Sequence, residues 1–463
     1  MNALILISSL GGLAMLAEIF NFRKALFGLV MLGLAGVIAL ALMDWNKEVA
    51  VAPIFKGMMV FDHFAILFTV IMSGTLFLWM MMSRSYFEEK TSATDHYAMV
   101  LFALAGAVVM VSYANMTMLF IGIEILSISM YVLCGSNKSD LSLNEAAFKY
   151  FLMGSFATGF LLFGIALLYG ATGSFDISVI SEAVFTGSMK ETKVLIVPGI
   201  LLMLIGMCFK VSAVPFHFWA PDVYQGAPTP VTAYMSTIVK TAAFAAFFKL
   251  FAACFSGVGA SWNNIVWGIA AATLLLSNIT AVYQQSVKRM LAYSSISHAG
   301  YMLLAILAMS PISGGSIIYY AAAYSVGSIA SFAVLIIVAK AKGNDSFDSF
   351  NGLAKQNPIL AFVMTIAMLS LAGIPPMAGF FAKYYIFSSA LTAGYTGLVC
   401  IAVIGSLISV YYYLRVIIAM YFKTSNDTSE IKISPIQQVL MVLVTALILA
   451  LGIFPDLLLS ALN

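Results

Sequence analysis

The chain has 463 residues, of which 62% are hydrophobic and only 9% are charged, and its mean hydropathy is +1.02. A soluble domain carries about 25% charged residues, so this composition excludes an ordinary globular enzyme and indicates a polytopic membrane protein. The net charge of +3 is spread along the chain, and no basic run resembles a nucleic-acid-binding surface, so we expect no nucleic-acid partner.

Charge-poor runs define the membrane helices, because a helix that crosses the hydrocarbon core needs about 20 apolar residues. The first run, 3–21, has no Lys or Arg before Arg23, so we expect a retained helix and not a secretory signal peptide. Alternation of period two is absent, which argues against a β-barrel. We expect an all-α protein with about fourteen membrane helices, within residues 3–21, 25–43, 64–83, 96–123, 125–137, 150–175, 194–215, 231–255, 250–287, 290–339, 356–382, 384–414 and 433–455.

Basic residues in the loops predict the orientation, because Lys and Arg concentrate on the cytoplasmic side of a membrane. With the N-terminus outside, twelve of them fall on the cytoplasmic side: Arg23, Lys24, Arg84, Lys90, Lys138, Lys288, Arg289, Lys340, Lys342, Lys355, Lys423 and Lys432. Four fall on the opposite side: Lys47, Lys56, Lys190 and Lys193. We therefore expect both termini to lie outside the cytoplasm.

Cofactor motifs are missing from the sequence. The cysteines form no C-x-x-C pair, and the four histidines lack metal-ligand spacing. Neither a P-loop nor a dinucleotide-binding glycine pattern is present. We expect no cofactor, no metal and no redox centre in this chain, so any energy it uses would come from another subunit or from an ion gradient.

Two charged residues lie where no loop is expected. Glu124 stands in LFIGIEILSISMYVL (119–133), and Lys210 begins KVSAVPFHFWAPDVYQGAPTPVTA (210–233). A charge at the bilayer centre costs about 2.5–3.5 kcal/mol on the mildest scale, so such residues line hydrated paths or pair with one another. Pro215 and the prolines after it predict a helix break beside Lys210, which is tolerated only inside protein or at a water-filled cavity. For Glu124, a purely structural ion pair is the alternative.

Four more cations lie within helical segments. Lys240, near mid-depth of the next helix, fits a functional or a structural role. Lys149, nearer the cytoplasmic end of its helix, would modulate Glu124 or lie at the interface. Lys249 and Arg415 are expected to extend to the membrane surface.

A second broken helix is expected in AGIPPMAGFFAKYYIF (372–387). The apolar segment 358–394 is too long for one straight span, and Pro375 and Pro376 mark the break, with Lys383 shortly after it. Interrupted helices in two halves of a chain are typical of inverted-repeat transporters with a site near the bilayer midplane.

One histidine lies between these halves. The stretch VKRMLAYSSISHAGYM (287–302) places His298 among Ser294, Ser295, Ser297 and Tyr301. Histidine titrates near neutrality and could relay protons between the halves; a neutral imidazole bonded to those hydroxyls is an equal alternative.

Buried lysines could move protons without a cofactor. Burial disfavours the charged form of lysine, and neighbouring charged groups titrate as a set, so a change at one site alters the proton affinity of the next.

These strings together resemble the antiporter-like subunits of respiratory complex I, the proton-translocating NADH–quinone oxidoreductase. The resemblance covers about residues 1–460. It implies two inverted five-helix repeats, which we place at 96–256 and 257–424, preceded by three helices in 1–95 and followed by one helix in 425–463.

The resemblance also implies roles for the buried charges. Glu124 and Lys210 would form the charge pair of the first repeat. Lys240 would be the connecting lysine and Lys383 the terminal lysine of the second repeat. Lys149 matches the lysine on the family's sixth helix. Subunit M of the family has glutamate at the terminal position, and subunit L continues into a lateral helix, whereas this chain has Lys383 and ends at Asn463. These two differences favour a branch of the family other than subunits M and L.

The implied function is proton translocation driven by electron transfer in partner subunits, which would carry flavin, iron–sulfur clusters and quinone. The implied partners are the neighbouring antiporter-like subunit, the small membrane subunits and the lipid bilayer. The implied location is an energy-transducing membrane such as the bacterial inner membrane. Two alternatives stay open: a cation/proton antiporter working outside an electron-transfer enzyme, and a membrane scaffold whose charges are only ion pairs.

Overall fold

The structure is a computed structural model that describes residues 1–17, 19–20, 23–45, 50–51, 55, 57–88, 93–186, 193–425 and 431–459. The described chain divides into two compact units. Unit 1 comprises Met1–Phe77, Arg84–Trp219 and Ile238–Gly268, and unit 2 comprises Leu78–Ser83, Ala220–Thr237 and Ile269–Asn463.

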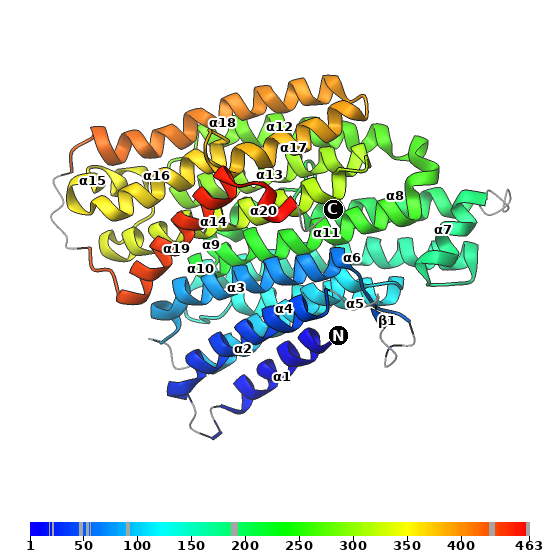
Figure 1. The fold of residues 1–463 in the computed structure, drawn as a ribbon, viewed down its shortest axis with the longest axis horizontal. Helices are drawn as coiled ribbons and strands as arrows, with labels where there is room; N and C mark the ends of the chain where they lie inside the picture. The colour runs from blue at the N-terminus through cyan, green and yellow to red at the C-terminus, as the bar shows by residue number, and fades with distance from the viewer. Residues whose placement is uncertain are drawn as a thin grey trace. The chain divides into compact units, whose positions relative to one another are not determined.

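Unit 1 is built from long apolar helices (Figure 1). Its closest helix pairs are α4 with α5 and α6 with α8, while α1 packs against α2 and α4. Two short strands, β1 (Ala50–Val51) and β2 (Val60–Phe61), pair antiparallel. The helices are α1 (Asn2–Leu16), α2 (Arg23–Met43), α3 (His63–Glu88, with Leu78–Ser83 in unit 2), α4 (Ala93–Ser112), α5 (Met116–Cys134), α6 (Leu141–Thr172), α7 (Ile177–Thr186), α8 (Lys193–Lys210), α11 (Lys240–Leu250), the π-helix η3 (Phe251–Phe255) and the 3₁₀ helix η4 (Ser256–Ser261).

Unit 2 has α14 at its centre, where it packs against α10, α13, α16, α17 and α19. Helices α13 and α14 are almost wholly buried. The helices are α9 (Trp219–Gly226), α10 (Thr229–Tyr234), the π-helix η2 (Met235–Val239), α12 (Asn263–Val282), α13 (Val287–Ala308), α14 (Ser313–Lys342), the 3₁₀ helix η5 (Phe347–Phe350), α15 (Leu353–Gln356), α16 (Pro358–Ala372), α17 (Ala378–Thr392), α18 (Thr396–Phe422), α19 (Pro435–Ile453) and α20 (Asp456–Leu459). Helices α9, η2 and α12 each have residues in both units.

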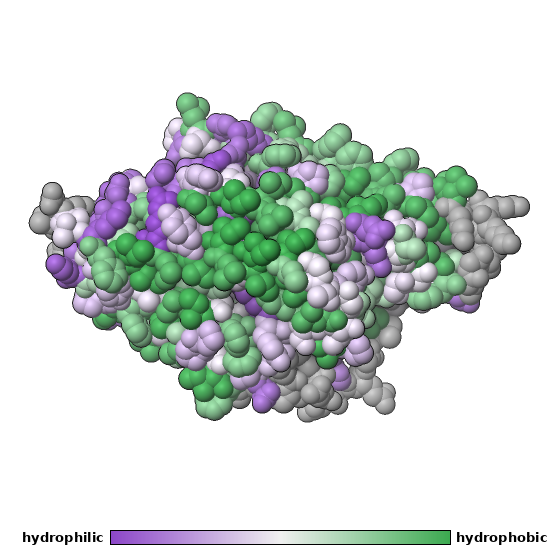
Figure 2. All heavy atoms as spheres, turned by 90° about the horizontal axis from the view of Figure 1, so that it is seen from above, coloured by the Kyte–Doolittle hydropathy of each residue, from purple (hydrophilic) through white to green (hydrophobic). Residues whose placement is uncertain are grey.

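The predicted membrane architecture is confirmed. Within the described residues, eleven helices are long and apolar enough to cross a membrane, and three shorter apolar helices, Asn2–Leu16, Val194–Lys210 and Pro358–Ala372, accompany them. Hydrophobic side chains cover much of the face seen in Figure 2, which fits contact with lipid. Lys47, Lys56, Lys90 and Lys190 lie outside the described residues, and the orientation stays a prediction, as do the boundaries of the two repeats.

Both expected helix breaks are present. Helix α8 ends at Lys210, and the chain passes Pro215 before α9 begins at Trp219. Helix α16 ends at Ala372, where Gly373 adopts a left-handed conformation with φ of 84°, and Pro375 and Pro376 precede α17. Two of the prolines after Pro215 begin helices, whereas the sequence pattern predicts that they break one. Pro221 and Pro230 lie in the first turns of α9 and α10, where the missing amide hydrogen has no helical partner to lose.

Small residues let α4 and α5 approach closely. A Cβ atom added to Gly122 would lie 2.8 Å from the backbone nitrogen of Met110, and one added to Gly106 would lie 2.7 Å from that of Leu126. In membranes, helix association relies on such close packing because lipid supplies no hydrophobic drive between helices.

We predict that Gly122→Val destabilises the protein by about 1–3 kcal/mol, because the added atoms meet backbone that cannot move aside. Gly159→Val on α6 is the matched control, since a Cβ atom there meets nothing within 4 Å. Thermal unfolding of the detergent-solubilised protein measures the difference. Equal stability of the two variants would contradict the close packing of α4 on α5.

Candidate functional site

The first part of the site is in unit 1, where Lys210 ends α8 with only 7% of its surface exposed. Its Nζ donates a hydrogen bond to the hydroxyl oxygen of Ser127 on α5. Ser127 in turn donates to the carbonyl oxygen of Ile123. Glu124 lies three residues before Ser127 and therefore on the same side of α5. The structure thus brings Lys210 and Glu124 into one cluster and adds Ser127 as the direct partner of the lysine.

Glu124 lies near the middle of α5, as its sequence context predicts. Its Oε1 is buried and has no hydrogen-bond partner among the residues that the structure describes. A buried carboxylate oxygen without a partner is costly, so this residue stays a candidate for the functional site.

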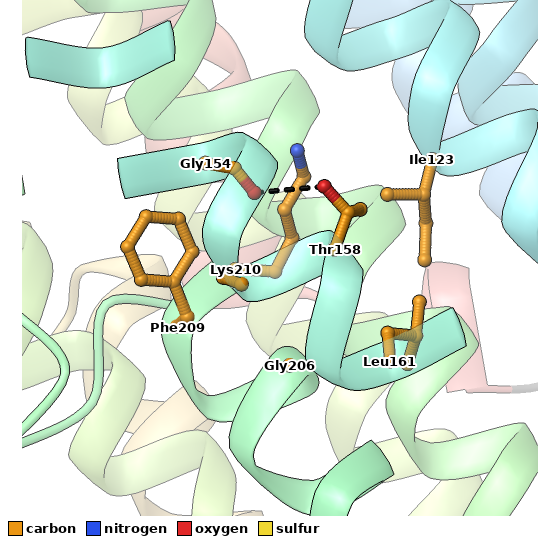
Figure 3. A pocket seen from close by; sticks show the side chains of 8 residues that line it. Ile123, Gly154, Thr158, Leu161, Gly206, Phe209 and Lys210 are labelled. Carbon is orange, nitrogen blue, oxygen red and sulfur yellow. Dashed lines mark hydrogen bonds between the residues drawn. The ribbon is translucent and has the colours of Figure 1, made fainter. Parts of the chain in front are cut away.

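A small cavity of about 10 Å³ adjoins Lys210 (Figure 3). Its walls come from α5, α6 and α8, and Thr158 of α6 donates to the carbonyl oxygen of Gly154 at 2.8 Å on one side of it. The space is close to that of a single water molecule. Glycines keep the helices close here, because a Cβ atom on Gly206 would lie 2.9 Å from the Cβ of Leu161.

The other lysines of unit 1 differ in their surroundings. Lys240 is buried, with 1% of its surface exposed, and begins α11 directly after the π-helix η2; π-helical turns are frequent at functional sites. Lys149 instead lies on an exposed face of α6, with 42% of its side chain exposed, and pairs with Glu145 at 2.7 Å.

Two further cations make specific contacts instead of extending freely to the surface. Lys249 donates to the carbonyl oxygen of Val111 at 3.2 Å and lies 3.8 Å from a carboxylate oxygen of Asp62. Arg415 in unit 2 donates to the carbonyl oxygens of Val282 and Gln284, at the C-terminal end of α12. Both contacts fit a structural role.

The second part of the site is in unit 2, around Lys383 on α17. Its buried Nζ donates to the carbonyl oxygen of Ala372 at 2.7 Å and to the hydroxyl of Ser406 at 2.9 Å. Ala372 is the last residue of α16, so the ammonium group lies at the C-terminal end of the broken helix, where the unpaired carbonyls favour positive charge. The same ammonium lies 5.0 Å from the centre of the Tyr301 ring.

His298 lies in a buried group of tyrosines in the same unit. Its Nδ1 is 2.6 Å from the hydroxyl of Tyr320, and its Nε2 is 3.1 Å from the hydroxyl of Tyr413. Tyr413 also bonds to Ser294. A cavity of about 10 Å³ lies between His298, Tyr320 and the break of α16, at Ser370 and Gly379.

Sequence reasoning missed the direct partners of the lysines. Ser127 carried a usable signal, because it follows Glu124 by three residues on one helix face. Ser406 and the Ala372 carbonyl carried none, because they meet Lys383 only through the packing of α16, α17 and α18. Among the described residues, no group of three or more His, Cys, Asp or Glu side chains is placed to hold a metal ion.

Comparison with known proteins first defines the class. The family model described as NADH:quinone oxidoreductase/Mrp antiporter, TM, matches residues 113–409. A chain of respiratory complex I from Thermus thermophilus has 31% sequence identity and a TM-score of 0.82, covering 99% of this chain and 98% of that one. A chain of the Mrp complex from Dietzia has a TM-score of 0.88 at 21% identity, which shows a shared fold. The chain is a multi-pass membrane protein of the antiporter-like class.

Curated relatives then give the particular family. NADH-quinone oxidoreductase subunit N of Cytophaga hutchinsonii is 44% identical over 462 residues, 99% of both chains. The subunit N of Flavobacterium psychrophilum is 44% identical over 463 residues, the full length of both. The chain belongs to the subunit N family of NADH-quinone oxidoreductase. The resemblance to the antiporter-like subunits of complex I, and the preference for a branch other than subunits M and L, are confirmed.

Proposed function

We propose that this chain is a membrane-arm subunit of respiratory complex I that moves protons across the membrane, driven by electron transfer from NADH to quinone in other subunits. The observation that carries the proposal is the pair of buried lysines, Lys210 and Lys383. Each lies at a helix break and each binds a serine hydroxyl. Charged side chains at membrane depth are rare and mark ion or proton paths.

The serine partners suit both charge states of the lysines. A charged ammonium donates to a hydroxyl oxygen, as Lys383 does to Ser406. A neutral amine has a lone pair and accepts from the same hydroxyl after it rotates. The Ala372 carbonyl can accept from either form of Lys383, because a neutral amine keeps two N–H donors, and its hydrogen bond with the charged ammonium is the stronger of the two. Lys383 can therefore change charge without leaving its place.

The remaining candidates take supporting roles in the proposal. Glu124 sets the proton affinity of Lys210, and Lys240 and His298 continue the path within their own units. Lys149 acts from the exposed face of α6, where it is paired with Glu145.

The chain works as a non-redox subunit, and flavin, iron–sulfur clusters and quinone belong to its partners. Its neighbours within the membrane are another antiporter-like subunit and the small membrane subunits. The membrane is the bacterial inner membrane, with both termini outside the cytoplasm. The names of the relatives and the complex I structure that contains a similar chain support this assignment.

Substitution of either lysine tests the proposal. We expect Lys210→Ala and Lys383→Ala each to lower proton translocation by the whole complex in proteoliposomes about tenfold or more, a loss typical of a missing proton-transfer group. Lys355→Ala, at an exposed position of α15, is the control and should pump normally. Unchanged pumping in both lysine variants would reject the proposal. Sodium- or potassium-driven proton exchange by the purified chain alone would favour a cation/proton antiporter instead.

A pair of glycines tests the position of Lys383. A Cβ atom on Gly373 would lie 2.8 Å from Cδ of Lys383, whereas one on Gly394 meets nothing within 4 Å. Both glycines have left-handed backbone, with φ of 84° and 86°, so alanine costs each roughly 1–2 kcal/mol of backbone strain. We predict similar thermal stability for Gly373→Ala and Gly394→Ala but severely reduced pumping only for Gly373→Ala. Equal pumping would show that the lysine need not be held where it is.

A further inference from the structure

We propose that the last long helix, α19, positions Lys383 by holding the break between α16 and α17 in the arrangement that brings the Ala372 carbonyl to the lysine. The residues that do this are Gly452 on α19 and Tyr319 on α14. The inference rests on the proposed function and deepens it, since it names positioning residues for Lys383 that lie outside the broken helix.

The break makes the contact of Lys383 depend on how two separate helices meet. The lysine is on α17, whereas the carbonyl of Ala372 that accepts from it at 2.7 Å belongs to the last residue of α16. A donor and an acceptor about 3.6 Å apart no longer form a hydrogen bond, so a shift of α17 against α16 by roughly 1 Å would break this contact. The interactions that hold the start of α17 in place therefore decide whether the lysine keeps its partner.

The end of α19 lies directly against the break. Helix α19 packs on α14, α16 and α17, and its Gly452 is buried. A Cβ atom on Gly452 would overlap the carbonyl oxygen of Pro376 and would lie 2.8 Å from the backbone nitrogen of Ala378, the first residue of α17. The backbone of α19 thus contacts the backbone of the break, and only glycine allows so close an approach.

A hydrogen bond joins the same end of α19 to α14. In a continuing helix the carbonyl of Leu451 would accept from the amide of residue 455, but that residue is Pro455 and has no amide hydrogen. The carbonyl accepts instead from the hydroxyl of Tyr319 at 2.6 Å. Tyr319 is wholly buried, and a hydrogen bond in such surroundings is stronger than one exposed to water.

The same tyrosine contacts the helix that carries Lys383. The ring centre of Tyr319 lies 5.4 Å from that of Tyr385, with the rings edge to face at 75°. Tyr385 follows Lys383 by two residues on α17, and its carbonyl oxygen accepts from the hydroxyl of Ser316 on α14 at 3.2 Å. Helix α17 is therefore held at its first turn by Gly452 and near Lys383 by Tyr319.

Both residues act on Lys383 through the backbone of the break and of α17, so they are positioning residues and not proton carriers. The geometry of proton transfer is strict enough for such a role to matter. A misplacement of about 1 Å caused by a distant substitution can slow a reaction by up to about 10²-fold.

The test is Gly452→Ala in the whole complex, reconstituted in proteoliposomes. The added methyl group overlaps backbone, so α19 or the break must move. We expect proton translocation to fall about tenfold or more and the ratio of its rates in H₂O and D₂O to rise, because proton transfer at Lys383 becomes limiting. A smaller amount of folded complex would lower the rate and leave the ratio unchanged. Gly397→Ala on α18, where a Cβ atom meets nothing within 4 Å, is the matched control and should change neither quantity.

Tyr319→Phe is the milder variant, which keeps the test open if Gly452→Ala does not assemble. It retains the ring against Tyr385 and removes only the bond to the Leu451 carbonyl. We expect translocation to slow about two- to tenfold, the factor that corresponds to one hydrogen bond, again with a raised isotope ratio. Tyr113→Phe is its control, because it removes a buried hydroxyl that donates to the carbonyl oxygen of Ala246 at 3.0 Å in unit 1. It should change neither quantity.

Backbone hydrogen exchange locates the effect. In both variants we expect faster exchange in residues 370–385, and not along α13, because the break opens locally. Normal pumping with an unchanged isotope ratio in Gly452→Ala and Tyr319→Phe would overturn the positioning role, even if exchange at the break rose. If Lys383→Ala still lost pumping in that case, the proposed function would stand without it. If Lys210→Ala and Lys383→Ala both pumped normally, both proposals would fail.

Discussion

The contact between the Lys383 ammonium and the Ala372 carbonyl depends on the interruption of a membrane helix. In a continuous helix that carbonyl would accept from the amide four residues ahead, and it would be a weaker and less accessible partner for a cation. Because α16 stops at Ala372, one of its last carbonyls points at an ammonium that lipid could not accommodate. The break and the lysine thus compensate for one another: each would be unfavourable in the membrane without the other.

Unit 1 reaches a related arrangement by different means. Lys210 is itself the last residue of its helix and binds a side chain, Ser127, instead of a carbonyl of a facing helix end. Its nearest carboxylate, Glu124, lies on the same helix face as that serine. Lys210 therefore lies near an acidic residue, whereas Lys383 contacts a helix end and a hydroxyl. The two lysines are placed to respond to different signals although both lie at helix breaks.

Much of this arrangement follows from the sequence. Hydropathy predicts the membrane class and the burial of Lys210, Lys240 and Lys383. Proline chemistry predicts the helix breaks at Pro215 and at Pro375 and Pro376. Both depend only on short stretches of chain. The partners of the lysines do not, because Ser406 reaches Lys383 only through the packing of three helices. The specific contacts of Lys249 and Arg415 could not be predicted for the same reason. Their contacts with Asp62 and with the end of α12 join segments far apart in the sequence.

Hydroxyl groups are the common element that charge counting overlooks. Ser127, Ser406 and the tyrosines around His298 carry no charge and add little to a hydropathy profile, yet they bond to Lys210, Lys383 and His298. A hydroxyl accepts from an ammonium and donates to an amine, so it serves both charge states of a lysine, whereas a carboxylate would hold the ammonium form. A path built from lysines and hydroxyls can therefore pass protons with small changes in energy at each step. Lys383, whose hydrogen-bond partners are the Ser406 hydroxyl and the Ala372 carbonyl, has the kind of surroundings that such a path requires.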